Sequence, residues 1–131
     1  MQMRSYFNSG ITRPCSFRKE QLKKLQAAVK KYEAQLHEGL FTDLKKSPEE
    51  CWVTETGFLL AEISNSLKHL KNWMEDESVS TNLLNLPSKR FVLKEPLGVM
   101  LIISPWNYHF QLLVKPLAGA MADGNCVVIK V

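Results

Sequence analysis

Apolar side chains recur every three or four residues along two stretches in the first half of the chain. The first stretch runs from Ser16 to about Leu44, with apolar positions at Leu22, Leu25, Val29, Tyr32, Leu36 and Leu40. The second begins at Pro48, with apolar positions at Trp52, Leu59, Ile63, Leu67, Leu70 and Met74. This spacing is the period of an amphipathic α-helix. We therefore predict two helices that pack against each other, because the connection between them is short.

The second helix has a strong start signal and a weak end signal. Ser47 is followed by Pro48 and then, at the third helical position, by Glu50. This order predicts a capping box, in which the two polar side chains bond to otherwise unpaired backbone amides. The acidic cluster 75–77 falls at the other end, where the helix dipole disfavours negative charge. We therefore expect the helix to fray there.

The segments on either side of the helical pair carry turn and strand signals. Residues 1–15 contain the turn-forming sequences Asn8-Ser9-Gly10 and Arg13-Pro14, which predict an extended lead segment. After residue 78, Leu83–Leu86 and Arg90–Lys94 flank a Pro-Ser-Lys sequence. That pattern predicts a hairpin or a pair of extended arms.

The last third of the chain has the order strand, helix, strand. Five consecutive apolar residues, Val99–Ile103, predict a strand covered on both faces, as in a parallel sheet. Residues 104–107 break this strand, and a helix is expected from there to about Asp123, closed by Gly124. Cys126–Ile129 predicts a second buried strand. Together these elements predict a right-handed βαβ unit.

The predicted fold class is therefore α/β. A helical pair and a β-hairpin arm lead into the first βαβ unit of a Rossmann-like parallel sheet, which is incomplete in this chain. We divide the chain into a lead and two-helix segment (1–77), a hairpin or extended arm (78–98) and the βαβ unit (99–131), which the family resemblance given below implies is the first βαβ unit of a truncated dinucleotide-binding domain.

Composition and charge exclude several classes of protein. The 131 residues are 45% hydrophobic and 23% charged, which is typical of a globular domain. The net charge of +4 is spread along the chain rather than clustered, so nucleic acid is not an expected partner. No apolar run approaches the ~20 residues of a membrane span, and we expect a cytoplasmic protein. Three cysteines without metal-ligand spacing predict neither a disulfide scaffold nor a metal site.

Candidate chemistry lies where the two strands end, because ligands of open parallel sheets bind beyond the carboxyl ends of the strands. Two readings of Asn107 are open: its side chain could cap the following helix, or its amide could stabilise a developing oxyanion. Lys130, at the end of the second strand, is either a solvated charge or a donor to a ligand hydroxyl or phosphate.

Several segments carry a resemblance to one enzyme family. Residues 95–108 (EPLGVMLIISPWNY), 116–120 (PLAGA) and 124–130 (GNCVVIK) resemble the start of the nucleotide-binding domain of the NAD(P)-dependent aldehyde dehydrogenase superfamily. Its class-3 branch, which acts on fatty and aromatic aldehydes, is resembled by FNSG (7–10), FRKEQL (17–22), DLKKSP (43–48), LKHL (67–70) and PSK (87–89). Nearly the whole chain is covered.

The resemblance implies oxidation of aldehydes to carboxylic acids with NAD or NADP. In this family a cysteine thiolate attacks the aldehyde, hydride passes to the nicotinamide, and a glutamate-activated water hydrolyses the thioester. By position, Asn107 would hold the oxyanion. The backbone around Ile103, Ser104, Pro105 and Trp106 would line the dinucleotide cleft, and Lys130 would bind the adenosine ribose hydroxyls. The implied partners are the aldehyde, the nicotinamide dinucleotide and a second copy of the chain in a homodimer.

The chain also departs from the family pattern. His109 stands where the family usually has Pro, and none of Cys15, Cys51 and Cys126 fits the catalytic nucleophile. The nucleophilic cysteine and general-base glutamate would lie further along, so we expect an N-terminal portion of an enzyme that is inactive alone. The alternatives are an inert truncated fragment, a helix-mediated interaction module, or a related acyl-phosphate or semialdehyde reductase.

Overall fold

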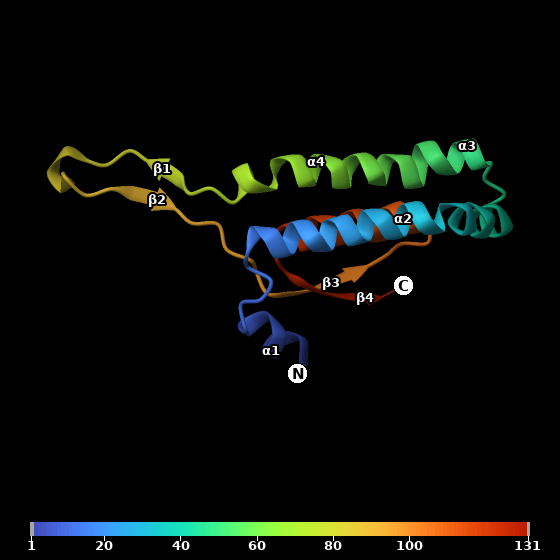
Figure 1. The fold of residues 1–131 in the computed structure, drawn as a ribbon, viewed down its shortest axis with the longest axis horizontal. Helices are drawn as coiled ribbons and strands as arrows, with labels where there is room; N and C mark the ends of the chain where they lie inside the picture. The colour runs from blue at the N-terminus through green and yellow to red at the C-terminus, as the bar shows by residue number, and fades with distance from the viewer. Residues whose placement is uncertain (1, 131) are drawn as a thin grey trace.

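The computed structural model describes residues 2–130, and residues 1 and 131, at the outer ends of the predicted first and third segments, lie outside it. Helices α2 and α4 run side by side with α5, and the two strands β3 and β4 lie against α5 (Figure 1). A β-hairpin extends from one end of the helices (Figure 1). In chain order the elements are α1 Gln2–Asn8, α2 Cys15–Leu44, α3 Pro48–Cys51, a π-helix η1 Trp52–Thr56, α4 Gly57–Trp73, β1 Glu77–Val79, a 3-10 helix η2 Leu83–Asn85, β2 Arg90–Val92, β3 Val99–Ile103, α5 His109–Ala122 and β4 Cys126–Lys130.

The two predicted helices are confirmed, and their apolar faces form the core. Residues of α2, α4 and α5 make one buried cluster of Leu22, Val29, Leu59, Ile63, Leu70, Val114, Ala118 and Ala122. Ser47 caps α3, since its Oγ accepts the Glu50 amide at 3.2 Å, and this confirms one of the two bonds of the predicted capping box. Two predicted core positions are wrong, because Tyr32 is 46% exposed and Trp52 is 55% exposed.

The π-helical turn explains why Trp52 is not buried. In an α-helix each amide bonds to the carbonyl four residues earlier, whereas in the π-helix η1 the partner lies five residues earlier. The turn therefore contains one extra residue, which rotates the side chains that precede it relative to those that follow it. The stripe of α4 therefore does not continue back to Trp52. The same turn directs Glu55 and Thr56 inward, and both are fully buried at 0% exposure.

The predicted extended lead is wrong for its first half. Gln2–Asn8 forms the helix α1, in keeping with the helix propensity of Gln, Met and Arg. The Asn8-Ser9-Gly10 signal ends this helix rather than interrupting an extended chain. Gly10 has φ of +77°, and its amide donates to the Phe7 carbonyl at 3.0 Å.

The hairpin is confirmed, but its first strand was assigned to the wrong residues. β1 (Glu77–Val79) pairs antiparallel with β2 (Arg90–Val92), with Ser78 opposite Phe91. Leu83–Leu86 is not a strand, because the Asn82 side chain caps a 3-10 turn there by accepting the Leu84 amide at 3.3 Å. α4 ends at Trp73, just before the acidic cluster, as the unfavourable dipole interaction predicted.

The strand–helix–strand order of the last third is confirmed. β3 and β4 are parallel and in register from Val99 opposite Cys126 to Ile103 opposite Lys130. The prediction that the strands are buried on both faces is wrong: Ile102 is 8% exposed, but Leu101 is 59% exposed and Ile103 is 66% exposed. Side chains of a strand alternate between faces. Within residues 2–130 the helices that contact β3 and β4 are α5 and the short α1, and they leave Leu101 and Ile103 exposed.

The C-terminal end of α5 is held by a buried arginine. Arg18 of α2 is 6% exposed and donates from Nε to the Thr12 carbonyl at 3.1 Å and from Nη1 to the Ala122 carbonyl at 3.2 Å. Burial lowers the pKa of Arg18 from its ordinary value, while the nearby Asp123 carboxylate opposes that effect. Gly124 follows in the left-handed region, with φ of +81°, as predicted for the residue that closes this helix.

A second contact sets the start of the parallel sheet. The Asn125 side-chain oxygen accepts the Gly98 amide at 2.8 Å, and the Cys126 amide donates to the Gly98 carbonyl at 2.9 Å. These two bonds hold the residues that precede β3 and begin β4 next to each other.

None of the helices within residues 2–130 has the length and apolarity required to cross a bilayer.

Candidate active site

Three of the six predicted site residues lie together where β3 and β4 end. Ile103 is the register partner of Lys130, and the Ser104 amide donates to the Lys130 carbonyl at 3.1 Å. The edge that the two strands share is the carboxyl edge, where open parallel sheets bind ligands. Lys130 is exposed, so its ammonium is available to a ligand.

The other three site residues form the turn that leaves this edge. Pro105, Trp106 and Asn107 connect β3 to α5 and are all exposed, with Trp106 at 88%. The turn begins at Ser104, which is 7% exposed, and its Oγ lies 3.3 Å from the Pro105 carbonyl and 3.4 Å from the His109 carbonyl. The hydroxyl therefore donates across the turn.

Beside this turn the surface is hollowed. A cavity of about 510 Å³ is lined by Pro105, Trp106 and His109 from the turn and by Asp43 and Leu44 from the end of α2. His109 is the first residue of α5 and lines this cavity.

The helix-capping interpretation of Asn107 has no support in the geometry. The residue at the cap position of α5 is Tyr108, whose side chain makes no capping bond. An N-terminal amide of the helix, that of Gln111, instead donates to the Glu55 carboxylate at 2.8 Å. Tyr108 has φ of +48°, a left-handed conformation that is uncommon for a bulky residue and that clusters at functional sites. The oxyanion role of Asn107 stays a prediction.

Glu55 and Lys46 contact the residues that follow the candidate turn, and the sequence did not predict either contact. Glu55 is fully buried, and its Oε1 accepts from the Lys46 ammonium at 2.7 Å. The same ammonium lies 4.3 Å from the centroid of the Tyr108 ring, within cation–π distance. A signal was present: Glu55 stands four residues before Leu59 and eight before Ile63, so it is a carboxylate at the spacing of the apolar stripe.

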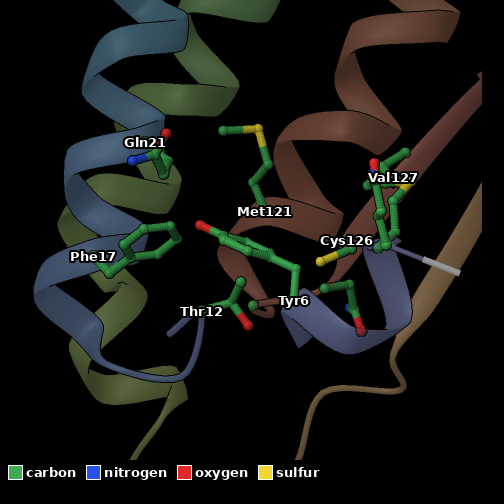
Figure 2. Close-up of a pocket in the computed structure, with 11 residues that line it drawn as sticks. Tyr6, Thr12, Phe17, Gln21, Met121, Cys126 and Val127 are labelled. Carbon is green, nitrogen blue, oxygen red and sulfur yellow. The ribbon is translucent and has the colours of Figure 1, made fainter. Parts of the chain in front are cut away.

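A second cavity lies at the opposite end of the parallel strands. Figure 2 shows Tyr6, Phe17 and Met121 pointing toward one space, next to Cys126. It measures about 370 Å³ and includes Thr12, whose buried hydroxyl has no hydrogen-bond partner among the described residues. Cys126 begins β4 and Lys130 ends it, so this cavity is separate from the carboxyl edge.

Two of the three cysteines have the properties of structural thiols. Cys51 and Cys126 are buried, and burial raises the pKa of both thiols from the ordinary value. A raised pKa leaves less thiolate, which is the reactive form. Cys15 lies on the first turn of α2, packed against the core cluster.

Comparison with known proteins agrees with this arrangement of helices, parallel strands and connecting turn. The family model described as "Aldehyde dehydrogenase family" matches residues 3–131. The chain is 48% identical over 127 residues to the 4,4'-diaponeurosporen-aldehyde dehydrogenase of Staphylococcus aureus, covering 97% of this chain and 28% of that protein. It is 46% identical over 129 residues to mouse aldehyde dehydrogenase family 3 member B3, covering 98% and 27%.

A solved structure shows the same fold. The substrate-bound state of Staphylococcus aureus AldH superimposes with a TM-score of 0.95 at 47% identity, covering 97% of this chain and 28% of that one. The α/β fold is thus that of the N-terminal region of these enzymes. The chain belongs to the aldehyde dehydrogenase family. It spans about 28% of the length of the relatives that it matches.

Proposed function

We propose that residues 1–131 are the N-terminal portion of an NAD(P)-dependent aldehyde dehydrogenase that oxidises aldehydes to carboxylic acids. The observation that carries the proposal is the carboxyl edge: the β3–α5 turn with Asn107 leaves β3 directly beside Lys130 at the end of β4. The family membership supplies the class of reaction. The activity belongs to the protein of which these residues are part, and this chain alone would be inactive.

The residues at the edge fit a nicotinamide dinucleotide, which serves as hydride acceptor when bound. Ile103 presents an apolar side chain that is 66% exposed, and Trp106 presents an indole that is 88% exposed. Both suit the apolar parts of such a cofactor. The exposed Lys130 ammonium donates hydrogen bonds and suits ribose hydroxyls. Ser104 and Pro105 fix the backbone of the same edge.

The proposed role of Asn107 is to donate its side-chain amide to the oxygen of the aldehyde as negative charge builds there. Such a bond strengthens only toward the transition state, so it lowers the barrier more than it tightens ground-state binding. The turn fits this task because Asn107 is exposed at the edge and is not used to cap α5.

The test is a pair of variants in the protein to which these residues belong. Asn107→Ala is expected to lower kcat by about 10²–10³-fold with little change in the KM for the dinucleotide. Lys130→Ala is expected to raise that KM with little change in kcat. Asn72→Ala, at an exposed asparagine of α4, is the matched control and should change neither constant. An unchanged kcat in Asn107→Ala would exclude the oxyanion role.

The alternative of a helix-mediated interaction module is not favoured. The centres of the apolar faces of α2 and α4 are buried against each other and against α5, with Leu22, Leu59 and Ile63 all at 0% exposure, so these side chains are not available to a partner. Two further parts of the proposal are a cytoplasmic location, which rests on the sequence pattern, and a homodimer, which the family resemblance implies.

A further inference from the structure

We propose that the buried carboxylate of Glu55, with Lys46 as its counter-ion, positions the turn 104–108 and thereby the side chain of Asn107. This rests on the proposed function, because it concerns the same site. Neither residue reaches the carboxyl edge itself. Both act through the start of α5, and we therefore regard them as positioning residues.

Glu55 uses its two oxygens for two different tasks. Oε1 accepts from the Lys46 ammonium at 2.7 Å, and Oε2 accepts from the Gln111 amide at 2.8 Å. Gln111 is the third residue of α5, so its amide is one of those that have no partner within the helix. A carboxylate at this position also faces the positive end of the helix dipole. The bond ties the start of α5 to η1, 56 residues earlier in the chain.

Lys46 holds the other side of the same turn. Its side chain is 10% exposed, and its ammonium lies 4.3 Å from the centroid of the Tyr108 ring. Tyr108 directly follows Asn107 and has the left-handed φ of +48°. Because a left-handed conformation at a bulky residue persists only when its surroundings enforce it, the contact with Lys46 helps to hold the turn in this form. The ion pair thus fixes both the ring and the backbone that follow Asn107.

Stability alone does not account for a buried ion pair at this place. Removing two charges from water offsets most of their attraction, and apolar residues of similar volume often stabilise a fold equally well. A geometric role does account for it, because charged groups with directional bonds define one arrangement. In a catalytic site this matters: a displacement of about 1 Å can reduce the rate about 100-fold.

Two variants separate the tasks of the carboxylate. Glu55→Gln keeps an oxygen that can accept the Gln111 amide but removes the charge beside Lys46. Glu55→Ala removes both. The matched control is Glu20→Gln, which neutralises an exposed carboxylate that also lies 2.7 Å from a lysine ammonium, that of Lys24. All are made in the protein to which these residues belong.

We expect Glu55→Ala to lower kcat by about 10- to 100-fold without changing the KM for the dinucleotide. Glu55→Gln should restore part of that loss, because the bond to α5 is retained. Amide hydrogen exchange should accelerate at Gln111 and its neighbours in Glu55→Ala while the amides of Leu59 and Ile63 in α4 keep their protection. Glu20→Gln should match the wild type in every measurement.

A further variant guards against loss of folding. The double variant Lys46→Met, Glu55→Gln leaves no unpaired buried charge and retains the acceptor for Gln111. It should fold, keep the slow exchange of Gln111 and still lose kcat, because Tyr108 loses its cation. The proposal is overturned if both Glu55 variants leave kcat and the exchange of Gln111 unchanged. It is also overturned if exchange rises equally in α4, since the role would then be general stability.

The two proposals can fail separately. If the wild-type protein oxidises no aldehyde, the proposed function fails, and the positioning role is then decided by exchange at Gln111 alone. If the wild type is active and Asn107→Ala abolishes turnover while the Glu55 variants do not reduce it, the function stands and the positioning role is wrong.

Discussion

Gly124 is a position where one methyl group is expected to disturb the end of α5. Its φ of +81° lies in the left-handed region, which residues with a Cβ rarely adopt. A Cβ built there would lie 2.6 Å from both Nε and Cζ of Arg18. An arginine head group in solvent would simply move aside. Arg18 is 6% exposed and bonded to two carbonyls, so moving it breaks both bonds.

The expected size of the effect of Gly124→Ala follows from these contacts. The left-handed conformation costs about 1–2 kcal/mol for a residue other than glycine. Each of the two hydrogen bonds from the charged guanidinium contributes about 1.5 kcal/mol or more. Alanine recovers at most about 1 kcal/mol by restricting the unfolded chain. The free energy of unfolding should therefore fall by about 3 kcal/mol, a large part of the ~5–15 kcal/mol that a domain possesses.

Urea unfolding followed by far-ultraviolet circular dichroism measures this loss. The matched control is Gly39→Ala, because Gly39 lies inside α2 and nothing within 4 Å would meet its new Cβ. Alanine is favoured over glycine within a helix by about 1 kcal/mol, so the two variants should shift the midpoint in opposite directions. If Gly124→Ala left the midpoint unchanged or raised it, the close approach of Arg18 would not be a constraint and the reasoning would be refuted.

Two further predictions concern the core and the thiols. Leu59 has 0% exposure and packs in the core formed by α2, α4 and α5. Leu59→Ala should lower the free energy of unfolding by about 2–5 kcal/mol in the same urea experiment. A loss below about 1 kcal/mol would contradict the assigned core. Burial raises the pKa of Cys51 and Cys126, so both should react with a disulfide reagent at pH 8 more slowly than Cys15. Mass spectrometry of the labelled peptides measures the order of reaction. Labelling of Cys126 before Cys15 would contradict the prediction.

The helical part of the fold could be predicted because its signal is local and repeated. The stripe from Leu59 to Leu70 covers several turns, so one misplaced residue does not hide the period. Trp52 was assigned to the wrong face because an α-helical period cannot reveal a π turn. Glu55 is buried within that turn, and its carboxylate accepts from the Gln111 amide, which lies in a distant part of the chain.

Strand partners and buried faces were harder to predict because they depend on segments far apart. Leu83–Leu86 has a strand-like composition, yet the pairing of β2 is made by Glu77–Val79, and the Asn82 cap turns the leucines into a 3-10 turn. The run Val99–Ile103 indicated a strand but not which face is covered. Burial of that strand depends on which elements pack on its faces, and in residues 2–130 the helices that contact it are α5 and the short α1.

At the candidate site too, the features set by neighbouring residues could be predicted, whereas contacts between distant segments could not. The order strand, Ser-Pro-Trp-Asn, helix placed the turn correctly, and the parallel pairing put Lys130 beside Ile103. The ion pair of Lys46 and Glu55 was not predicted, because the bond between the Glu55 carboxylate and the Gln111 amide forms only when the chain is folded. A polar residue on an apolar stripe is therefore a signal for a buried contact with a segment that lies elsewhere in the sequence.

Helix α5, which follows the candidate turn, has a charged side chain of another element bonded to each of its ends. The Glu55 carboxylate meets an amide at the N-terminal end, and the Arg18 guanidinium meets the Ala122 carbonyl at the C-terminal end. Each charge has the sign that the helix dipole favours, and both come from the helical layer rather than from the sheet. The strands fix where the carboxyl edge lies, whereas the helices fix the orientation of α5 and hence of the turn before it. Substitutions at Arg18 and Glu55 should therefore affect the Asn107 turn from opposite ends, although neither residue touches it.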